Sequence, residues 1–286
     1  DCWFESGSMP YAQLHYPFDH KEKFEKGYPA DFIAEGIDQT RGWFYTLIVL
    51  STALFDVPAF KNIIVNGIVL ANDGRKMSKR LKNYTPPDEL METYGADALR
   101  LYLIHSGLVK AEEQRFNDEG VKEMVRKTLL PWYNAFKFLK TYAEVDQWKP
   151  SSDSRLSSSH ILDKWILSRL ESLKSYIEQH MRNYELYLVV PALLEFLDEL
   201  TNTYIRLNRQ RFWTETMDQD KHDAYETLFH VLHDFSLCMA PFTPFLSEYI
   251  YNKMLDLGLD KSHKSIHLKP YPQPQDHLRN LLLEEA

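Results

Sequence analysis

A short polar segment carries two lysines three positions apart, Lys76 and Lys79, with Met77 and Ser78 between them. Lysine offers a compact positive charge on a flexible stem, so two lysines on one loop can converge on a polyphosphate. Ser78 can add a hydroxyl or a backbone donor. The simpler alternative is a solvated surface turn, because a fixed string of four residues arises by chance in about 1 in 500 chains of this length.

The position of this segment favours the polyphosphate. It follows directly on a β-branched run at residues 63–70. The start of this run, residues 62–65 followed by Gly67, predicts a buried strand of a parallel sheet. A β-like run at residues 31–34 and a helical pattern at residues 41–54 complete the order strand, helix, strand. Open α/β sheets bind ligands beyond the carboxyl ends of their strands. The first part of the chain is therefore expected to be α/β and Rossmann-like, with the lysines at its ligand-binding edge.

From residue 121 onward long helical periods take over, and Gly258 is the only glycine after Gly120. This change predicts two domains, residues 1–120 and an all-α helical bundle at residues 121–286. The helices of the bundle are expected at residues 121–142, 161–177, 185–213, 221–239 and 246–255.

Local signals add detail to this second domain. Ser159 is a candidate N-cap, and Pro191 is expected to kink its helix or to lie in the first turn. The serine-rich residues 148–159 are expected to form an exposed linker. The tail contains Pro270, Pro272 and Pro274 and is expected to be extended and mobile.

Composition excludes several classes of protein. With 44% apolar and 26% charged residues the 286-residue chain can bury a substantial core, and a net charge of −8 excludes a globally basic nucleic-acid-binding protein. A polyanion must bind to a local patch, and positive charge is concentrated at residues 75–82 and at Arg206, Arg209 and Arg211.

Cysteine usage and hydropathy narrow the class further. The two cysteines lie far apart, and neither belongs to a metal-binding pattern, so no disulfide framework, zinc site or other metal site is predicted in this segment. His230 and His233 are spaced as a weak metal pair but are expected to be ordinary helix residues. The longest apolar run, at residues 47–55, is far shorter than the roughly 20 residues of a membrane span, and a cytoplasmic protein fits best. Because the chain starts inside an apparent motif and without Met, we expect a piece of a longer protein.

The lysine segment, residues 73–80, resembles the KMSKS loop with which class I aminoacyl-tRNA synthetases bind ATP. Arg80 replaces the final serine, and both lysines remain. Residues 35–44 (EGIDQTRGWF) resemble the isoleucyl form of these enzymes, and residues 1–8 (DCWFESGS) resemble the point where the chain re-enters the catalytic domain after an inserted editing domain. The resemblance covers nearly the whole chain and is closest to the eukaryotic-like branch of the isoleucyl-tRNA synthetase family; it continues through residues 95–100, 163–169 and 204–206.

This resemblance implies a ligase that activates isoleucine with ATP and Mg²⁺ and transfers it to tRNA(Ile). It assigns catalysis to Lys76, Ser78 and Lys79, and ATP binding to Lys76, Met77 and Lys79. It assigns isoleucine and adenylate binding to Glu35, Gly36, Asp38, Gln39, Trp3 and Trp43, and tRNA binding by the anticodon-binding bundle to Arg206, Arg209 and Arg211. Without the resemblance, helix capping is the favoured explanation of the two acids, and a buried tryptophan is more often part of the core. Each arginine is then equally well explained as an ion-pair partner.

Two features expected of a complete ligase do not occur in this segment: a His-Ile-Gly-His string, which supplies the other part of the ATP site, and the editing domain. We therefore expect this fragment to be inactive by itself. The whole enzyme is expected to be a monomer. Two alternatives stay open, a non-catalytic tRNA-binding module with a synthetase fold and a valine-specific ligase.

Overall fold

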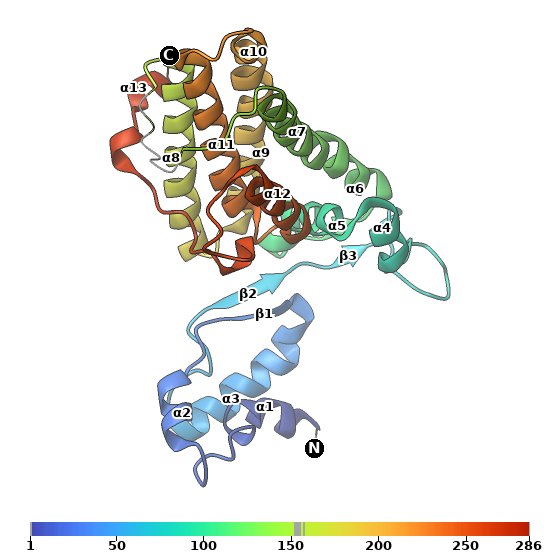
Figure 1. Ribbon diagram of the computed structural model, residues 1–286. Coiled ribbons are helices and arrows are strands. Elements are labelled where there is room, and N and C mark those ends of the chain that lie inside the picture. The colour runs from blue at the N-terminus through green and yellow to red at the C-terminus, as the bar shows by residue number, and fades with distance from the viewer. Residues whose placement is uncertain (1, 152–155, 157, 286) are drawn as a thin grey trace. The chain divides into compact units, whose positions relative to one another are not determined.

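The protein is described by a computed structural model that covers residues 2–151, 156 and 158–285 (Figure 1). Its internal contacts divide the chain into two compact units. The first, here called the α/β unit, comprises Asp1–Asn83 and Ser106–Phe116. The second, the helical unit, comprises Tyr84–His105 and Asn117–Ala286.

Residues 84–105 pack with the helical unit, although the sequence analysis groups them with the first domain. Helix α4 (Pro87–Tyr94) begins at a proline in its first turn, as the sequence predicts, and α5 (Ala96–His105) follows it. The carboxylate of Asp97 accepts hydrogen bonds from the backbone N–H groups that open a late helix, at 2.7 Å from Leu246 N. Arg100 Nη2 donates to the Pro241 carbonyl at 2.9 Å. Polar contacts over some 140 positions in sequence therefore attach α5 to the bundle.

The α/β unit combines short strands with helices. Its elements are α1 (Cys2–Ala12), α2 (Lys21–Gly27), β1 (Ile33–Gly36), the 3₁₀ helix η1 (Ile37–Arg41), α3 (Trp43–Phe55), β2 (Ile63–Asn66), β3 (Val69–Leu70), the 3₁₀ helix η2 (Gly107–Lys110) and β4 (Gln114–Arg115). β1 pairs in parallel with β2 from Ile33–Ile63 to Gly36–Asn66, and β3 pairs in parallel with β4. The predicted strand–helix–strand order with parallel strands is confirmed.

The run at residues 63–70 was expected to be one strand, buried at residues 62–65, and both expectations are wrong, since Ile63 is 45% exposed and the run is divided. It is interrupted at Gly67, whose N–H donates to the Leu108 carbonyl at 2.8 Å. A β-carbon at Gly67 would lie 1.7 Å from the Glu112 carbonyl oxygen, so only glycine allows this close backbone approach. The run therefore contributes two strands to two separate two-stranded sheets.

Helices α1 and α3 pack closely in the α/β unit. A β-carbon at Gly7 of α1 would lie 2.8 Å from Leu50 Cδ1 of α3, which shows how near the two helices approach. Trp43 Nε1 donates to the Ser6 carbonyl at 3.0 Å and ties the start of α3 to α1. The core of this unit centres on Leu47, Ala59 and Phe60.

The helical unit contains the helices that the sequence predicts, with two wide π-helical turns added. Its further elements are α6 (Asp118–Met124), η3 (π, Val125–Leu129), α7 (Leu130–Val145), α8 (Ile161–Arg182), α9 (Leu186–Asp198), η4 (π, Glu199–Ile205), α10 (Arg206–Trp213), α11 (Gln219–Met239), α12 (Pro244–Leu257), the 3₁₀ turns η5 (Ile266–Leu268) and η6 (Asp276–Leu278), and α13 (Leu281–Glu284). α11 packs against α7, α8, α10 and α12, and it is buried along most of its length. The fold class predicted for this part, an all-α bundle, is confirmed.

One local prediction needs correction. The N-cap of α8 is His160, whose Nδ1 accepts from Leu162 N at 3.2 Å, and not Ser159. Pro191 lies inside α9 and beyond its first turn, which excludes one of its two predicted roles and leaves the kink as a prediction. Of the expected linker, Trp148 is buried and stacks on Tyr225, while residues 152–155 and 157 lie outside the described residues.

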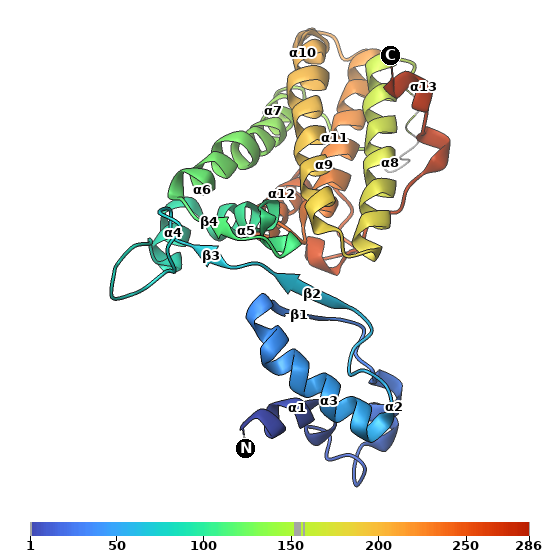
Figure 2. The same ribbon diagram turned by 180° about the vertical axis from the view of Figure 1, so that it is seen from behind.

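The tail is neither wholly extended nor loose, because it lies along α8, as the view from behind shows (Figure 2). Gln275 N donates to Glu171 Oε2 at 2.6 Å, Asn280 N donates to Ser168 Oγ at 2.7 Å, and Glu284 Oε1 accepts from Ser172 Oγ at 2.8 Å. These hydrogen bonds hold the short elements η6 and α13 against the bundle. None of the helices in the described part of the chain combines the length and the apolar character that a membrane crossing requires.

Candidate functional site

The lysine loop is the segment 71–83, which follows β3. A narrow turn opens it, because Ala71 N donates to the Arg75 carbonyl at 2.9 Å and Gly74 takes a positive φ of 79°. Asp73 accepts from Arg75 N at 3.0 Å and from Arg75 Nε at 2.7 Å. These hydrogen bonds from Arg75 hold the pKa of the Asp73 carboxyl below its usual value. The guanidinium of Arg75 is therefore paired within its own turn.

The two lysines of the loop are available to bind a ligand. Lys76 and Lys79 are exposed, and within the described part of the chain neither ammonium group has an ion-pair or hydrogen-bond partner. Ser78 N donates to Asn83 Oδ1 at 2.9 Å, so this backbone donor is already used inside the loop. The arrangement offers two unneutralised positive charges after a parallel strand, which suits a polyphosphate anion.

The predicted amino-acid pocket surrounds the end of β1. Glu35 is exposed on this strand, and Gly36 closes it. A β-carbon at Gly36 would lie 2.6 Å from Asp38 Oδ1, so glycine keeps room for the Asp38 carboxylate. Gln39 Oε1 accepts from Trp43 N at 3.0 Å and caps α3, while Gln39 Nε2 donates to Asp38 Oδ2 at 3.3 Å. The side-chain amide of Gln39 therefore orients the carboxylate of its neighbour and the start of the helix.

The two predicted tryptophans both lie near Gly42, Trp43 as its neighbour in sequence and Trp3 through the fold. A β-carbon at Gly42 would lie 3.4 Å from Trp3 Cζ3 and 2.8 Å from Gln39 Oε1. Trp3 is 57% exposed, and Trp43 is half-buried. The structure thus brings Trp3, Gln39 and Trp43 together around the turn from η1 into α3.

The three arginines of the bundle fall into two groups. Arg206 and Arg209 are exposed, as expected for an RNA-binding face. Arg211 is different, because its side chain is 10% exposed and binds Asp163 Oδ1 and Asp220 Oδ1, each at 2.8 Å. Since Asp163 is fully buried, the guanidinium of Arg211 neutralises a core carboxylate, and its predicted role at tRNA needs correction.

A buried polar cluster joins α8 to α11, and the sequence analysis missed its acidic members. Glu171, His230 and Asp234 place ligand atoms within 4.8 Å of one another, a spacing that suits a metal ion. The ammonium of Lys174, however, lies 2.8 Å from Glu171 Oε1 and 2.6 Å from Asp234 Oδ2. Because this ammonium already pairs with both carboxylates, the cluster is an internal ion-pair network. Glu171 and Lys174 are neighbours on α8, and His230 and Asp234 are neighbours on α11, but only the folded bundle brings the two pairs together.

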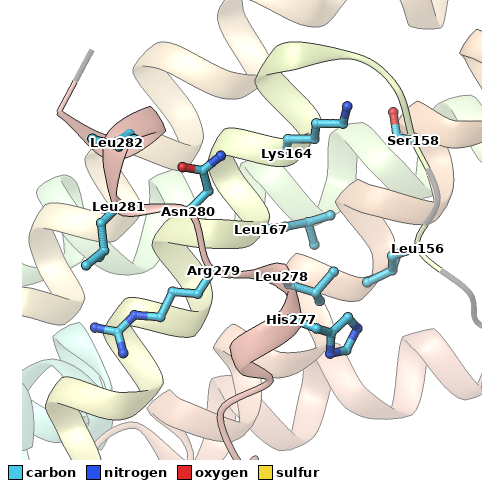
Figure 3. Close-up of a pocket in the computed structure, with 10 residues that line it drawn as sticks. All are labelled: Leu156, Ser158, Lys164, Leu167, His277, Leu278, Arg279, Asn280, Leu281 and Leu282. Carbon is cyan, nitrogen blue, oxygen red and sulfur yellow. The ribbon is translucent and has the colours of Figure 1, made fainter.

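A cavity of about 570 Å³ opens on the helical unit between α8 and the tail (Figure 3). Lys164 and Leu167 line it from α8, and residues 277–282 line it from the tail. None of the predicted site residues contributes to it. A second cavity, of about 440 Å³, is lined by Lys127, Asn134, Asn202 and Arg209 among others, so the exposed Arg209 borders a concave polar surface.

Comparisons with known proteins address the two parts of the chain in turn. Residues 1–115 match the family "tRNA synthetases class I (I, L, M and V)", and residues 163–286 match the family "Anticodon-binding domain of tRNA ligase". Residues 1–115 belong to the class I aminoacyl-tRNA synthetases, and residues 163–286 belong to the anticodon-binding domains of tRNA ligases. The resemblance of its loop and flanking motifs to this class is confirmed.

Among the relatives of this synthetase chain is an isoleucine–tRNA ligase of Bdellovibrio bacteriovorus, 54% identical over 286 residues that make up 100% of this chain and 27% of the relative. A probable cytoplasmic isoleucine–tRNA ligase of Dictyostelium discoideum is 50% identical over 293 residues, which cover 100% of this chain and 28% of the relative. The chain thus spans about a quarter of the length of the curated relatives it matches.

Solved structures share the fold of this class I chain. The LeuRS of Agrobacterium radiobacter K84, in a ternary complex with tRNA and LeuAMS, superposes with a TM-score of 0.73 at 18% identity, over 98% of this chain and 33% of that one. Mycobacterium tuberculosis methionyl-tRNA synthetase with methionyl-adenylate gives a TM-score of 0.72 at 21% identity, over 92% and 52% of the two chains. The predicted order of folds, an α/β part followed by a helical bundle, is confirmed by these structures.

Proposed function

We propose that this chain is the KMSK-loop and anticodon-bundle part of an isoleucine–tRNA ligase, which forms isoleucyl-adenylate from isoleucine and ATP and then acylates tRNA(Ile). The observation that carries this proposal is the loop after β3, with Lys76 and Lys79 both exposed and without a carboxylate partner in the described part of the chain. Relatives named isoleucine–tRNA ligase, which match along the whole chain, support isoleucine as the amino acid.

The reaction needs no nucleophile from the protein. The carboxylate of isoleucine attacks the α-phosphorus of ATP, the bond to the bridging oxygen breaks, and pyrophosphate leaves. Lys76 and Lys79 stabilise the negative charge that develops on the phosphates, with Met77 and Ser78 setting the loop between them. Mg²⁺ accompanies the phosphates and supplies further positive charge there. Catalysis is then positioning and charge stabilisation.

In this proposal the end of β1 holds the amino acid. The carboxylates of Glu35 and Asp38 bind the α-ammonium group, and Gly36 lets the substrate approach the backbone. Gln39 Nε2 donates to Asp38 Oδ2, so Gln39 orients this carboxylate as well as facing the adenylate. The indoles of Trp3 and Trp43 provide an apolar surface for the branched side chain.

In the same proposal, the helical bundle binds the tRNA. A net charge of −8 cannot attract RNA as a whole, so binding falls on exposed cations such as Arg206 and Arg209. Arg209 borders a cavity that Lys127, Asn134 and Asn202 also line, and these groups can bind phosphates or base edges. The cytoplasmic relative from Dictyostelium supports a cytoplasmic ligase, and we propose that it acts as a monomer.

The experiment is isoleucine-dependent exchange of pyrophosphate into ATP by the full-length ligase that contains this chain. We expect Lys79→Ala to lower the rate of adenylate formation about 10²- to 10³-fold, the usual effect of removing one contact to developing charge, with the Kd for isoleucine unchanged. Lys23→Ala, which removes the same charge from an exposed position of the α/β unit, serves as the matched control and should retain full activity.

Three outcomes would contradict the proposal. Unchanged single-turnover activation by Lys79→Ala would reject the role of the loop. Binding of tRNA without any ATP-dependent exchange in the wild-type protein would support the alternative of a non-catalytic module. Equal activation of valine and isoleucine would reject the amino-acid assignment, because the missing methylene of valine should weaken its contact with an isoleucine pocket.

A further inference from the structure

The side-chain amide of Asn83 links two backbone groups of the lysine loop, those of Ser78 and Lys76. Asn83 Oδ1 accepts a hydrogen bond from Ser78 N at 2.9 Å, and Asn83 Nδ2 donates to the Lys76 carbonyl oxygen at 3.2 Å. A backbone N–H can only donate and a carbonyl can only accept, so the two bonds fix which end of the amide faces each group. Asn83 reaches back five and seven positions, which distinguishes it from an asparagine that caps its own turn.

The loop beyond this contact is anchored at the same place. The Ser78 carbonyl accepts from Leu81 N at 3.1 Å and from Lys82 N at 3.0 Å, and Lys82 takes a positive φ of 47° that reverses the chain. Ser78 is therefore held at its N–H by Asn83 and at its carbonyl by the turn. Lys79 is the next residue, so its backbone directly follows a residue that is hydrogen-bonded at both its N–H and its carbonyl group.

Among the described residues, no side chain holds the ammonium group of Lys76 or Lys79 in place. Their side chains are exposed, and no ion pair or hydrogen bond within the described residues orients either ammonium group. Their separation therefore depends on the backbone between Lys76 and Lys79, and Asn83 bridges the part of it from Lys76 to Ser78.

We propose that Asn83 is a positioning residue that fixes the distance between Lys76 and Lys79 and so pre-organises the ATP-binding loop. This inference rests on the proposed function, because it assumes that the two lysines act together on the phosphates. Asn83 touches neither substrate nor reacting atoms in this role. Its amide acts through the backbone of the two lysines, and a side chain of another length or chemistry cannot make both bonds at once.

The first test measures single-turnover adenylate formation in the full-length ligase for Asn83→Ala and Asn83→Gln. Asn83→Ala removes both hydrogen bonds, and Asn83→Gln keeps the amide but moves it by one methylene. We expect both variants to form adenylate about 10- to 100-fold more slowly, since a misplacement of about 1 Å can cost 10²-fold, with the Kd for isoleucine unchanged. A variant that is merely less stable would not separate rate from binding in this way.

The matched control is Asn62→Ala, which also removes an amide-to-backbone hydrogen bond from an exposed asparagine of the α/β unit. Asn62 Nδ2 donates to the Asp31 carbonyl at 2.9 Å, outside the lysine loop. This variant should keep the wild-type rate. An equal loss in Asn62→Ala would overturn the inference, because the effect would then belong to the unit as a whole.

The second test needs no ATP and uses the 286-residue chain itself. Trypsin cleaves after lysine and arginine, and the loop offers it Arg75, Lys76, Lys79, Arg80 and Lys82. We expect faster cleavage inside the loop in Asn83→Ala than in the wild type or Asn62→Ala, with cleavage elsewhere unchanged. Unchanged cleavage of the loop overturns the inference whatever the rates show.

The role of Asn83 and the proposed function can be contradicted separately. A normal rate in Asn83→Ala, together with an impaired Lys79→Ala, overturns the role of Asn83 and leaves the proposed function intact. A normal rate in both variants overturns the proposed function as well.

Discussion

Two arginines on one helix illustrate how much the surroundings of a residue decide its role. Arg209 and Arg211 have the same chemistry and lie two positions apart on α10, which places them on different faces. Arg209 is exposed, whereas Arg211 binds the fully buried Asp163 at 2.8 Å. The first is available to an RNA phosphate, and the second stabilises the bundle.

This contrast gives a paired prediction. Arg211→Ala leaves Asp163 buried without its cation, so we expect the free energy of unfolding to fall by about 3–5 kcal/mol in urea denaturation. Arg209→Ala should change it by less than about 0.5 kcal/mol but should lower the log–log salt slope of tRNA binding by about 0.7 to 0.9. The roles would be wrongly assigned if Arg209→Ala lowered stability while tRNA affinity and salt slope stayed at wild-type values.

At the scale of elements, α8 and α11 are joined by the ionic cluster around Lys174, and this contact should make stability depend on pH. His230 is half-buried beside Asp234, His233 and Lys174; its Nε2 lies 3.7 Å from Asp234 Oδ2 and has no hydrogen-bond partner among the described residues. Burial lowers the pKa of the His230 imidazole below its usual value of 6.5. The unfolded chain therefore binds a proton that the folded chain does not, from about pH 6.5 down to the folded pKa, and stability falls with falling pH in that window.

The measurement is the free energy of unfolding between pH 7.5 and pH 5.5 for the wild type and for His230→Gln, which cannot titrate. We expect the wild type to lose up to about 1.4 kcal/mol per pH unit more than the variant below pH 6.5. Parallel profiles for the two proteins would show that His230 keeps its ordinary pKa in the folded chain.

Elements with a strong local pattern were predictable from sequence. The apolar periodicity of α8 and the strand–helix–strand order around α3 depend on neighbours within a few residues. The break at Gly67 depends on Glu112, and the attachment of the tail depends on Glu171 and Ser168, more than a hundred positions before it. These features arise from tertiary contacts that no local window contains.

The candidate site follows the same division. The loop lysines were recognisable because their motif is contiguous and follows a strand. Arg211 was assigned to RNA because its partner Asp163 lies 48 positions away in sequence. Asn83 was missed because its amide reaches backward along the loop, which an asparagine in a polar segment does not reveal.

At the scale of the whole molecule, each unit has its own hydrophobic core. Leu47 packs with Ala59 and Phe60 in the α/β unit, where it is 2% exposed, and Leu193 is 0% exposed in the helical unit. The α/β unit buries few large apolar side chains besides Phe24, Phe44, Leu108 and Phe116, whereas buried apolar residues run through α7, α8, α9 and α11. The smaller core predicts the lower stability, since the fraction of surface buried rises with the size of the unit.

Hydrogen–deuterium exchange of the 286-residue chain can measure the stability of each unit separately. We expect Leu47→Ala to lower the protection free energy of amides in α3 by about 2–5 kcal/mol and to leave α8 unchanged, and Leu193→Ala to lower that of α8 and α9 and to leave α3 unchanged. In the wild type, α3 should exchange before α8 as urea is raised. Loss of protection in both units on either substitution would show that they unfold as one cooperative body, because a two-state chain transmits any loss of core stability to every protected amide.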